Sequence, residues 1–145
     1  MSLEQKINNL ETDLHIMGTL VLESLVSAVR ALEDKDIAKA SVVIDKDDEI
    51  DDAYMKIDQD WFELMATEQP VASDLRLSTS ILQASLHLER LGDLSVYLGK
   101  TTHEIHDLPI PESLHKIVIE MGDMVIDMAS SALESLKNRD AELAL

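Results

Sequence analysis

Hydrophobic residues recur along this chain at alternating spacings of three and four, which is the period of an amphipathic helix. The stripe is longest over residues 3–33, where it contains Leu3, Ile7, Leu10, Leu14, Met17, Val21, Leu25, Ala28 and Leu32. The same pattern predicts further helices over residues 37–66, 71–105 and 112–137. Asp36 suits the N-cap of the second helix, Pro70 suits the first turn of the third, and Asp140 is placed to cap a fifth. We therefore expect an all-α fold of long helices packed side by side.

Two of the predicted helices carry carboxylates at positions where the apolar seam calls for a hydrophobic residue. Asp47 interrupts the seam Val43, Asp47, Ile50, Tyr54, Ile57, Trp61 and Leu64, and Asp51 follows one turn later. Glu89 and Asp93 interrupt the seam Leu82, Leu86, Glu89, Asp93 and Val96. Residues i and i+4 share one face of a helix. We therefore expect Asp47, Asp51, Glu89 and Asp93 to form one site where these two helices pack together.

Two interpretations of this site remain open on the residues alone. Buried carboxylates are costly unless they are paired, neutralised or bound to a metal, so the site is either a metal site or an ion-pair network with Arg90 as counter-ion. Oxygen ligands without Cys or His suit Mg, Mn or Fe better than a structural zinc. The acidic run at residues 45–52 is not an EF-hand loop, because it lacks the glycine at the sixth position.

Composition narrows the class of protein further. The chain has 145 residues, of which 46% are hydrophobic and only 3% aromatic, and this favours one helical domain. Its net charge of −17 disfavours nucleic acid and anionic lipid as partners and favours cations and basic protein surfaces. There is no cysteine, no apolar run of the roughly 20 residues that span a membrane and no signal peptide, so we expect a cytoplasmic protein without membrane insertion.

A repeat is present at a constant offset of 104 residues. The identical pairs are Met17/Met121, Gly18/Gly122, Val21/Val125, Ser27/Ser131, Ala28/Ala132, Leu32/Leu136, Asp36/Asp140 and Ala40/Ala144. A fixed period indicates a duplicated unit, here of three helices. We expect a three-helix repeat at 1–107, a proline-containing linker at 108–111 and the first helix of a second, incomplete repeat at 112–145. Counterparts of the four carboxylates would fall beyond residue 145.

Four segments together resemble the PhoU family of regulators that accompany bacterial phosphate-specific transport. They are Met17–Val21, Val43–Asp51, Ala66–Arg76 with the sequence ATEQPVASDLR, and Leu88–Asp93 with the sequence LERLGD. Each motif is weak alone, but their order and separation are specific. The resemblance implies two three-helix bundles in pseudo-twofold repeat. One departure is Tyr97, where the family commonly has Asn.

The resemblance also implies a function. It implies acid-x-x-x-Asp motifs that hold multinuclear iron or zinc, matched here by Asp47/Asp51 and Glu89/Asp93. It implies a non-enzymatic negative regulator that links the phosphate ABC transporter, through its ATPase, to a sensor histidine kinase. The alternative is a carboxylate-bridged dimetal hydrolase such as a phosphohydrolase, which would normally add His ligands and a basic residue near the motifs.

Self-association is the last expectation. The predicted helix at 112–137 carries the apolar residues Met121, Met124, Val125, Met128, Ala132 and Leu136. The helices that would cover this stripe in a complete second repeat are absent from the sequence. Exposed apolar patches of this kind drive association, so we expect a homodimer or higher oligomer with residues 112–145 in the interface.

Overall fold

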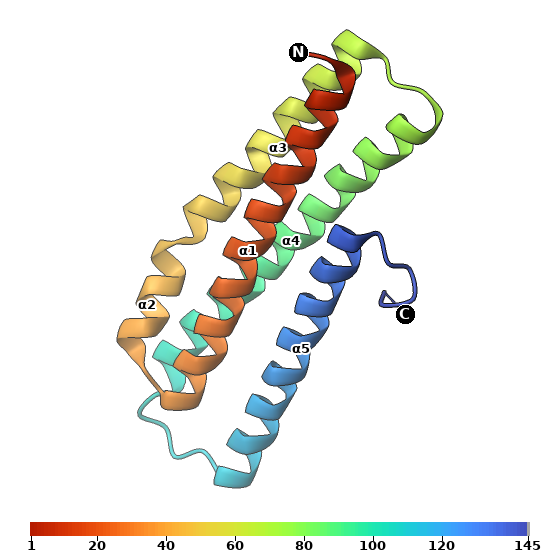
Figure 1. Cartoon of the computed structure of the whole chain (residues 1–145). Coiled ribbons are helices and arrows are strands. Elements are labelled where there is room, and N and C mark those ends of the chain that lie inside the picture. The colour runs from red at the N-terminus through yellow and green to blue at the C-terminus, as the bar shows by residue number, and fades with distance from the viewer. Residues whose placement is uncertain (145) are drawn as a thin grey trace.

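The computed structural model describes residues 1–144, and all regular structure within that range is α-helical (Figure 1). The helices are α1 (Leu3–Asp34), α2 (Ile37–Asp45), α3 (Asp47–Glu68), α4 (Ala72–Ile105) and α5 (Glu112–Asn138). Helix α1 packs against each of the other four helices. The all-α prediction is confirmed, and the first, third and fourth predicted helices agree with α1, α4 and α5 to within one residue at each end.

Local sequence signals account for the ends of α1. Ser2 and Gln5 form a capping box, in which the Ser2 side chain accepts from the Gln5 backbone and the Gln5 side chain accepts from the Ser2 backbone. The helix ends at Lys35 in the left-handed conformation. The predicted cap at Asp36 is confirmed, since its Oδ1 accepts from the Lys39 backbone N–H at 2.9 Å. Pro70 was expected inside the next helix but lies two residues before α4 begins.

The predicted helix at 37–66 is divided at Lys46, and this corrects the sequence-based prediction. Lys46 has φ −89° and ψ 0°, which ends α2 and begins α3. The break falls within the acidic run, where a continuous helix would stack like charges one turn apart. Starting a new helix at Asp47 places Asp47, Asp48 and Glu49 in its first turn, where the helix dipole favours negative charge.

The hydrophobic core lies between α1, α3 and α4. It consists of the buried residues Ile7, Leu10, Leu14, Met17, Val21, Ile50, Ile57, Leu64, Ile81 and Leu88. The stripe predicted on α1 supplies half of this cluster, and the seam predicted on α3 supplies Ile50, Ile57 and Leu64. Residues 3–34 are also long and apolar enough to cross a membrane by length and composition alone. The core helix of a helical bundle is equally long and apolar, and the apolar stripe of α1 is buried in the core of this bundle.

Helix α4 buries a different face from the one predicted. Apart from Val96, the predicted seam is not buried: Leu82, Leu86 and Glu89 are only partly covered and Asp93 is exposed. The buried face consists mainly of small residues, namely Ser78, Ser85, Gly92, Ser95, Gly99 and Thr102, with Ile81, Leu88 and Val96. A Cβ added at Gly99 would lie 3.1 Å from the Ala40 carbonyl oxygen. Small residues therefore allow α2 and α3 to approach α4 closely.

Helix α5 runs antiparallel along α1, on a different side from α2 and α3 (Figure 1). A Cβ added at Gly18 would lie 2.6 Å from Cδ2 of Leu133, and one added at Gly122 would lie 2.8 Å from Cγ1 of Val29. These two contacts are exchanged by the 104-residue offset, because Gly18 corresponds to Gly122 and Val29 to Leu133. The two copies of the repeated helix therefore contact each other reciprocally.

The ends of α1 and α5 are also alike. Lys35 and Arg139, 104 residues apart, both have φ 53°. The residue that follows each one donates its backbone N–H to a carbonyl five residues back, from Asp36 to Ala31 at 2.8 Å and from Asp140 to Ser135 at 2.9 Å. After Asp140 the described residues form a turn, in which Asp140 Oδ1 accepts from the backbone N–H groups of Glu142 and Leu143. The further helix that Asp140 was expected to cap does not form within the described residues.

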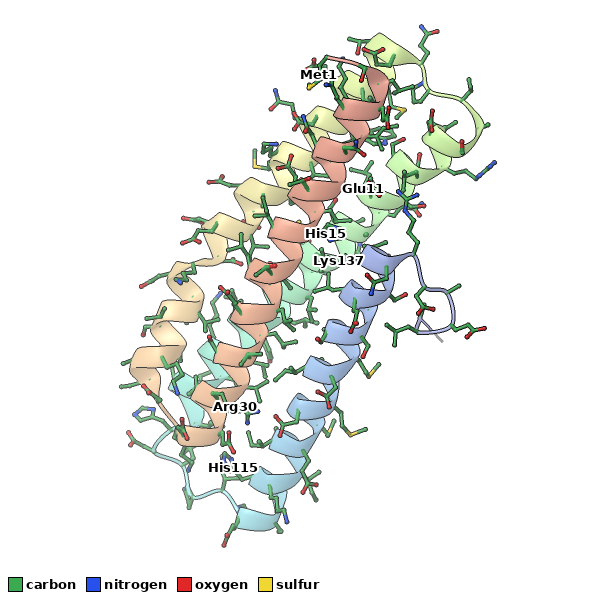
Figure 2. All side chains as sticks on the ribbon, in the orientation of Figure 1. Met1, Glu11, His15, Arg30, His115 and Lys137 are labelled. Carbon is green, nitrogen blue, oxygen red and sulfur yellow. The ribbon has the colours of Figure 1, made fainter. Side chains whose placement is uncertain are left out.

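Polar contacts fix α5 on α1, and three of the residues that take part in them, Glu11, Arg30 and His115, are labelled in Figure 2. Arg30 on α1 forms an ion pair with Asp123 on α5. Near the other end of the helix pair, Arg139 Nη2 lies 2.8 Å from Glu11 Oε1. His115 Nε2 lies 3.0 Å from the Glu33 carbonyl oxygen. These contacts lie at both ends of the α1–α5 pair, so α5 has a defined position in the fold although α1 is the only described helix whose backbone comes close to it.

Candidate metal site on helices α3 and α4

Two pairs of carboxylates lie on adjacent helices at one level of the bundle. Asp47 and Asp51 occupy the first two turns of α3, and Glu89 and Asp93 lie at the middle of α4. The helices meet at Ile50 and Gly92, where a Cβ added to the glycine would lie 3.1 Å from Ile50 side-chain atoms. Each contact residue directly precedes an acid of the site. The close approach that Gly92 permits therefore sets how near the two acidic pairs come to each other.

The acids of the two helices act on one another electrostatically. Burial raises the pKa of Asp47, and the negative charges of Asp51 and Asp93 raise that pKa further. Burial is also the largest cause of the raised pKa of Glu89, followed by the charges of Asp93 and Asp51. Each of these two groups responds to acids on the opposite helix, so the structure brings all four predicted site residues into one electrostatic cluster.

One oxygen of this cluster has no partner. Asp47 Oδ1 is buried, and no hydrogen-bond donor lies within reach of it among the described residues. A buried acceptor without a partner costs about 1–3 kcal/mol. A bound cation would satisfy such an oxygen, and the charge of a cation would relieve the repulsion among the neighbouring acids. The donor set of this structure therefore fits a metal with a preference for oxygen ligands.

The side chains do not converge on a single point. Within residues 1–144, no group of three or more His, Cys, Asp or Glu side chains is placed to hold one metal ion. Asp93 is exposed while Asp47, Asp51 and Glu89 are partly buried, so the cluster opens to solvent along α4. The expectation that both acids of α4 point into the core is wrong. Their face is turned toward α3 and the solvent.

The ion-pair interpretation finds little support in the geometry. Neither Arg90 nor any other Lys or Arg lies within ion-pair distance of the four acids in the described part of the chain. Arg90 and Lys100 act only at longer range, lowering the pKa of Glu89 and of Asp47 respectively, in each case against larger effects that raise it.

Lys100 is a residue near this site that the sequence analysis did not consider, and its charge acts on Asp47 from a distance. Its position seven residues after Asp93 places it two turns further along the same face of α4, and this spacing was a usable signal. His103 and His106 do not join the site. His103 Nε2 lies 2.9 Å from Ser41 Oγ on α2, and His106 Nδ1 lies 2.8 Å from the His103 carbonyl oxygen.

Comparison with known proteins identifies the family. The PhoU domain model matches residues 14–102, which contain all four acids. A PhoU homologue of the phosphate-specific transport system from Pseudomonas aeruginosa is 32% identical over 140 residues, covering 97% of this chain and 58% of the relative. The homologue from Pseudomonas putida is 31% identical, with 97% and 55% covered. The chain belongs to the PhoU family, and it spans little more than half the length of these relatives.

Solved structures agree with the fold. The crystal structure of PhoU from Pseudomonas aeruginosa superimposes with a TM-score of 0.94 at 30% identity, over 98% of this chain and 68% of that one. The phosphate transport system regulatory protein PhoU from Streptococcus pneumoniae gives 0.88 at 27% identity, over 98% and 66%. The arrangement of α1 to α5 is therefore the arrangement of these helices in solved members of the family.

Proposed function

We propose that this protein is a non-enzymatic negative regulator of phosphate uptake and phosphate-starvation signalling. Its relatives are named accessory and regulatory proteins of phosphate-specific transport, and the chain shares their fold over nearly its whole length. The site residues carry the proposal further. Four interacting acids on two helices, with one unsatisfied buried oxygen, support a cation rather than a substrate as the ligand in this proposal.

Asp47, Asp51, Glu89 and Asp93 would hold the metal in this proposal. The ions concerned are iron or zinc in a multinuclear site, with Mn and Mg as further oxygen-preferring candidates. The metal would supply positive charge between α3 and α4, which neutralises the acids and links the two helices. The protein's own contribution is positional. The break at Lys46 places Asp47 at the start of α3, and Gly92 allows α3 close to α4.

The proposed partners are the ATPase of the phosphate transporter and the sensor histidine kinase, which this protein would connect. A chain with a net charge of −17 presents a strongly acidic surface, and basic patches on either partner would complement it. Association should therefore weaken as salt concentration rises. A cytoplasmic location follows from these partners. The absence of cysteine is compatible with a reducing compartment.

Deleting the gene tests the regulatory role. We expect the deletion strain to express phosphate-uptake genes in phosphate-rich medium, where the parent strain keeps them silent. A wild-type copy should restore silencing, and the double variant Glu89→Gln/Asp93→Asn should not, because it replaces two of the four proposed ligands and should no longer hold metal between α3 and α4. The matched control is Asp58→Asn/Glu104→Gln, which removes the same charge from exposed positions outside the site. Silent uptake genes in the deletion strain would refute the role, while silencing restored by the Glu89/Asp93 variant would refute the need for metal.

A further inference from the structure

Helix α3 carries a second seam on its outer face, opposite the seam that packs into the core. Its residues follow the alternating spacing of four and three that one helix presents to another, and all of them are exposed. Two are large apolar side chains, Met55 at 65% and Phe62 at 70% exposed, which lie two turns or about 10 Å apart. This outer seam consists of Asp48, Asp52, Met55, Gln59, Phe62 and Ala66.

Acidic side chains surround the apolar part of the outer seam. Lys56 is the single basic residue of α3, and it is already held in ion pairs with one acid of α1 and one of α3. The seam begins with two acids, and further acids lie one turn before Phe62 and directly after it. The exposed acids of this face that form no ion pair with a described residue are Asp48, Asp52, Asp58 and Glu63.

The outer seam faces away from the second copy of the repeat. Helices α3 and α5 lie on different sides of α1 (Figure 1). The reciprocal contacts of Gly18 with Leu133 and of Gly122 with Val29 relate α1 and α5 by an approximate twofold axis. That operation would carry α2, α3 and α4 to the far side of α5. The outer seam therefore stays exposed whether or not a second repeat follows.

We infer that the outer seam of α3 docks a basic amphipathic helix of a partner protein. The apolar residues of that helix would cover Met55 and Phe62, and its Lys or Arg residues would meet the acids around them. A second copy of the outer seam does not suit this surface, because it would bring acid against acid. The inference deepens the proposed regulatory function and rests on it, since it names the kind of segment through which the transporter ATPase or the kinase would bind.

A synthetic peptide tests the apolar part of this surface on the full chain. The probe is a labelled amphipathic helix with leucine on one face and lysine on the other, followed by fluorescence anisotropy. We expect binding that weakens as salt rises, and none for the same peptide with glutamate in place of lysine. Phe62→Ser should weaken binding about tenfold or more, because it removes the central aromatic anchor. The matched control Met121→Ser, at a 60% exposed position of α5, should leave binding nearly unchanged.

Charge variants test the acidic part. Asp48→Asn/Asp52→Asn should weaken peptide binding about fivefold and reduce its dependence on salt. The control Asp127→Asn/Glu134→Gln removes the same charge from exposed positions of α5 and should have a smaller effect. All these variants should melt within about 2 °C of wild type, because each replaces an exposed side chain. A loss of binding in a variant that melts normally is then a loss of contact rather than of folding.

The docking role is also measurable in the deletion strain. A copy that carries Phe62→Ser should fail to restore silencing of the phosphate-uptake genes, whereas Ile16→Ser, at a 54% exposed position of α1, should restore it. Equal peptide binding by wild type and Phe62→Ser, or equal losses in Phe62→Ser and Met121→Ser, would overturn the inference. Silencing restored by Phe62→Ser would also overturn it while leaving the regulatory function intact. Uptake genes that stay silent after deletion would instead refute the regulatory function, and the peptide measurements would still decide the docking.

Discussion

Ferric or divalent ions are expected to raise the melting temperature of the wild-type protein by about 8 °C when free metal reaches about 100 times its Kd. A ligand that binds only the folded state stabilises it by about 2.7 kcal/mol under that condition. For a chain of this size, each kcal/mol raises the melting temperature by about 2–4 °C. Asp47 Oδ1 and the repulsion around Glu89 are the features that the metal would relieve. Differential scanning fluorimetry across Fe, Zn, Mn and Mg measures the shift.

The double variant Glu89→Gln/Asp93→Asn should lose this shift and should also melt slightly higher than wild type without metal. The second expectation follows from the raised pKa of Glu89 in the folded state. A carboxyl whose pKa is raised by folding favours folding when protonated, and stability falls as pH rises above its unfolded pKa. At neutral pH the neutral amides remove this penalty. If the acids were instead an ion-pair network, the same variant would melt lower than wild type, so the metal-free comparison separates the two interpretations.

Truncation of two equivalent methionines should have unequal effects. Met17→Ala is expected to lower the free energy of unfolding by about 2–5 kcal/mol, because Met17 is fully buried in the core between α1, α3 and α4. Met121→Ala removes the same side chain from the equivalent position of α5, where it is 60% exposed. Its cost in the isolated monomer should stay within about 0.5 kcal/mol. Urea unfolding at low protein concentration gives both values.

Protein concentration adds a control to that comparison. If a second copy of the chain covers the apolar stripe of α5 that contains Met121, as the sequence analysis expects, the cost of Met121→Ala should grow as protein concentration rises, because the substitution then weakens a folded dimer. The cost of Met17→Ala should not change. Equal costs for the two substitutions at low concentration would mean that α5 buries its stripe within its own chain, contrary to the packing described above.

The helices of this fold could be predicted from the sequence because their apolar residues follow a regular period and their caps are explicit. Asp36 is an example, since an acid directly before an amphipathic stretch defined the end of one helix and the start of the next. The break at Lys46 was missed because apolar periodicity continues across it from Val43 to Ile50. The backbone breaks at Lys46 within the acidic run, and a hydrophobic pattern carries no information about such a break.

The buried face of α4 was missed for another reason. The prediction gave weight to large apolar residues such as Leu82 and Leu86, whereas close packing against α2 and α3 selects small ones. Ser78, Ser85, Gly92 and Gly99 occur at every seventh residue, and that regular spacing was the available signal. The membership of the acidic site could still be predicted, because i and i+4 carboxylates on two adjacent helices share a face wherever that face points. How deeply each acid is buried depends on how the helices pack, and this could not be predicted from the sequence.

Direct metal analysis tests the central claim, that Asp47, Asp51, Glu89 and Asp93 bind metal. Wild-type protein and the variant Glu89→Gln/Asp93→Asn would be purified without a chelator or an affinity tag and measured by inductively coupled plasma mass spectrometry. We predict at least one iron or zinc ion for each wild-type chain, and a loss of most of that metal in the variant but not in the control Asp58→Asn/Glu104→Gln. Equal metal content in wild type and the Glu89/Asp93 variant, or none in either after incubation with iron and zinc, would contradict the claim.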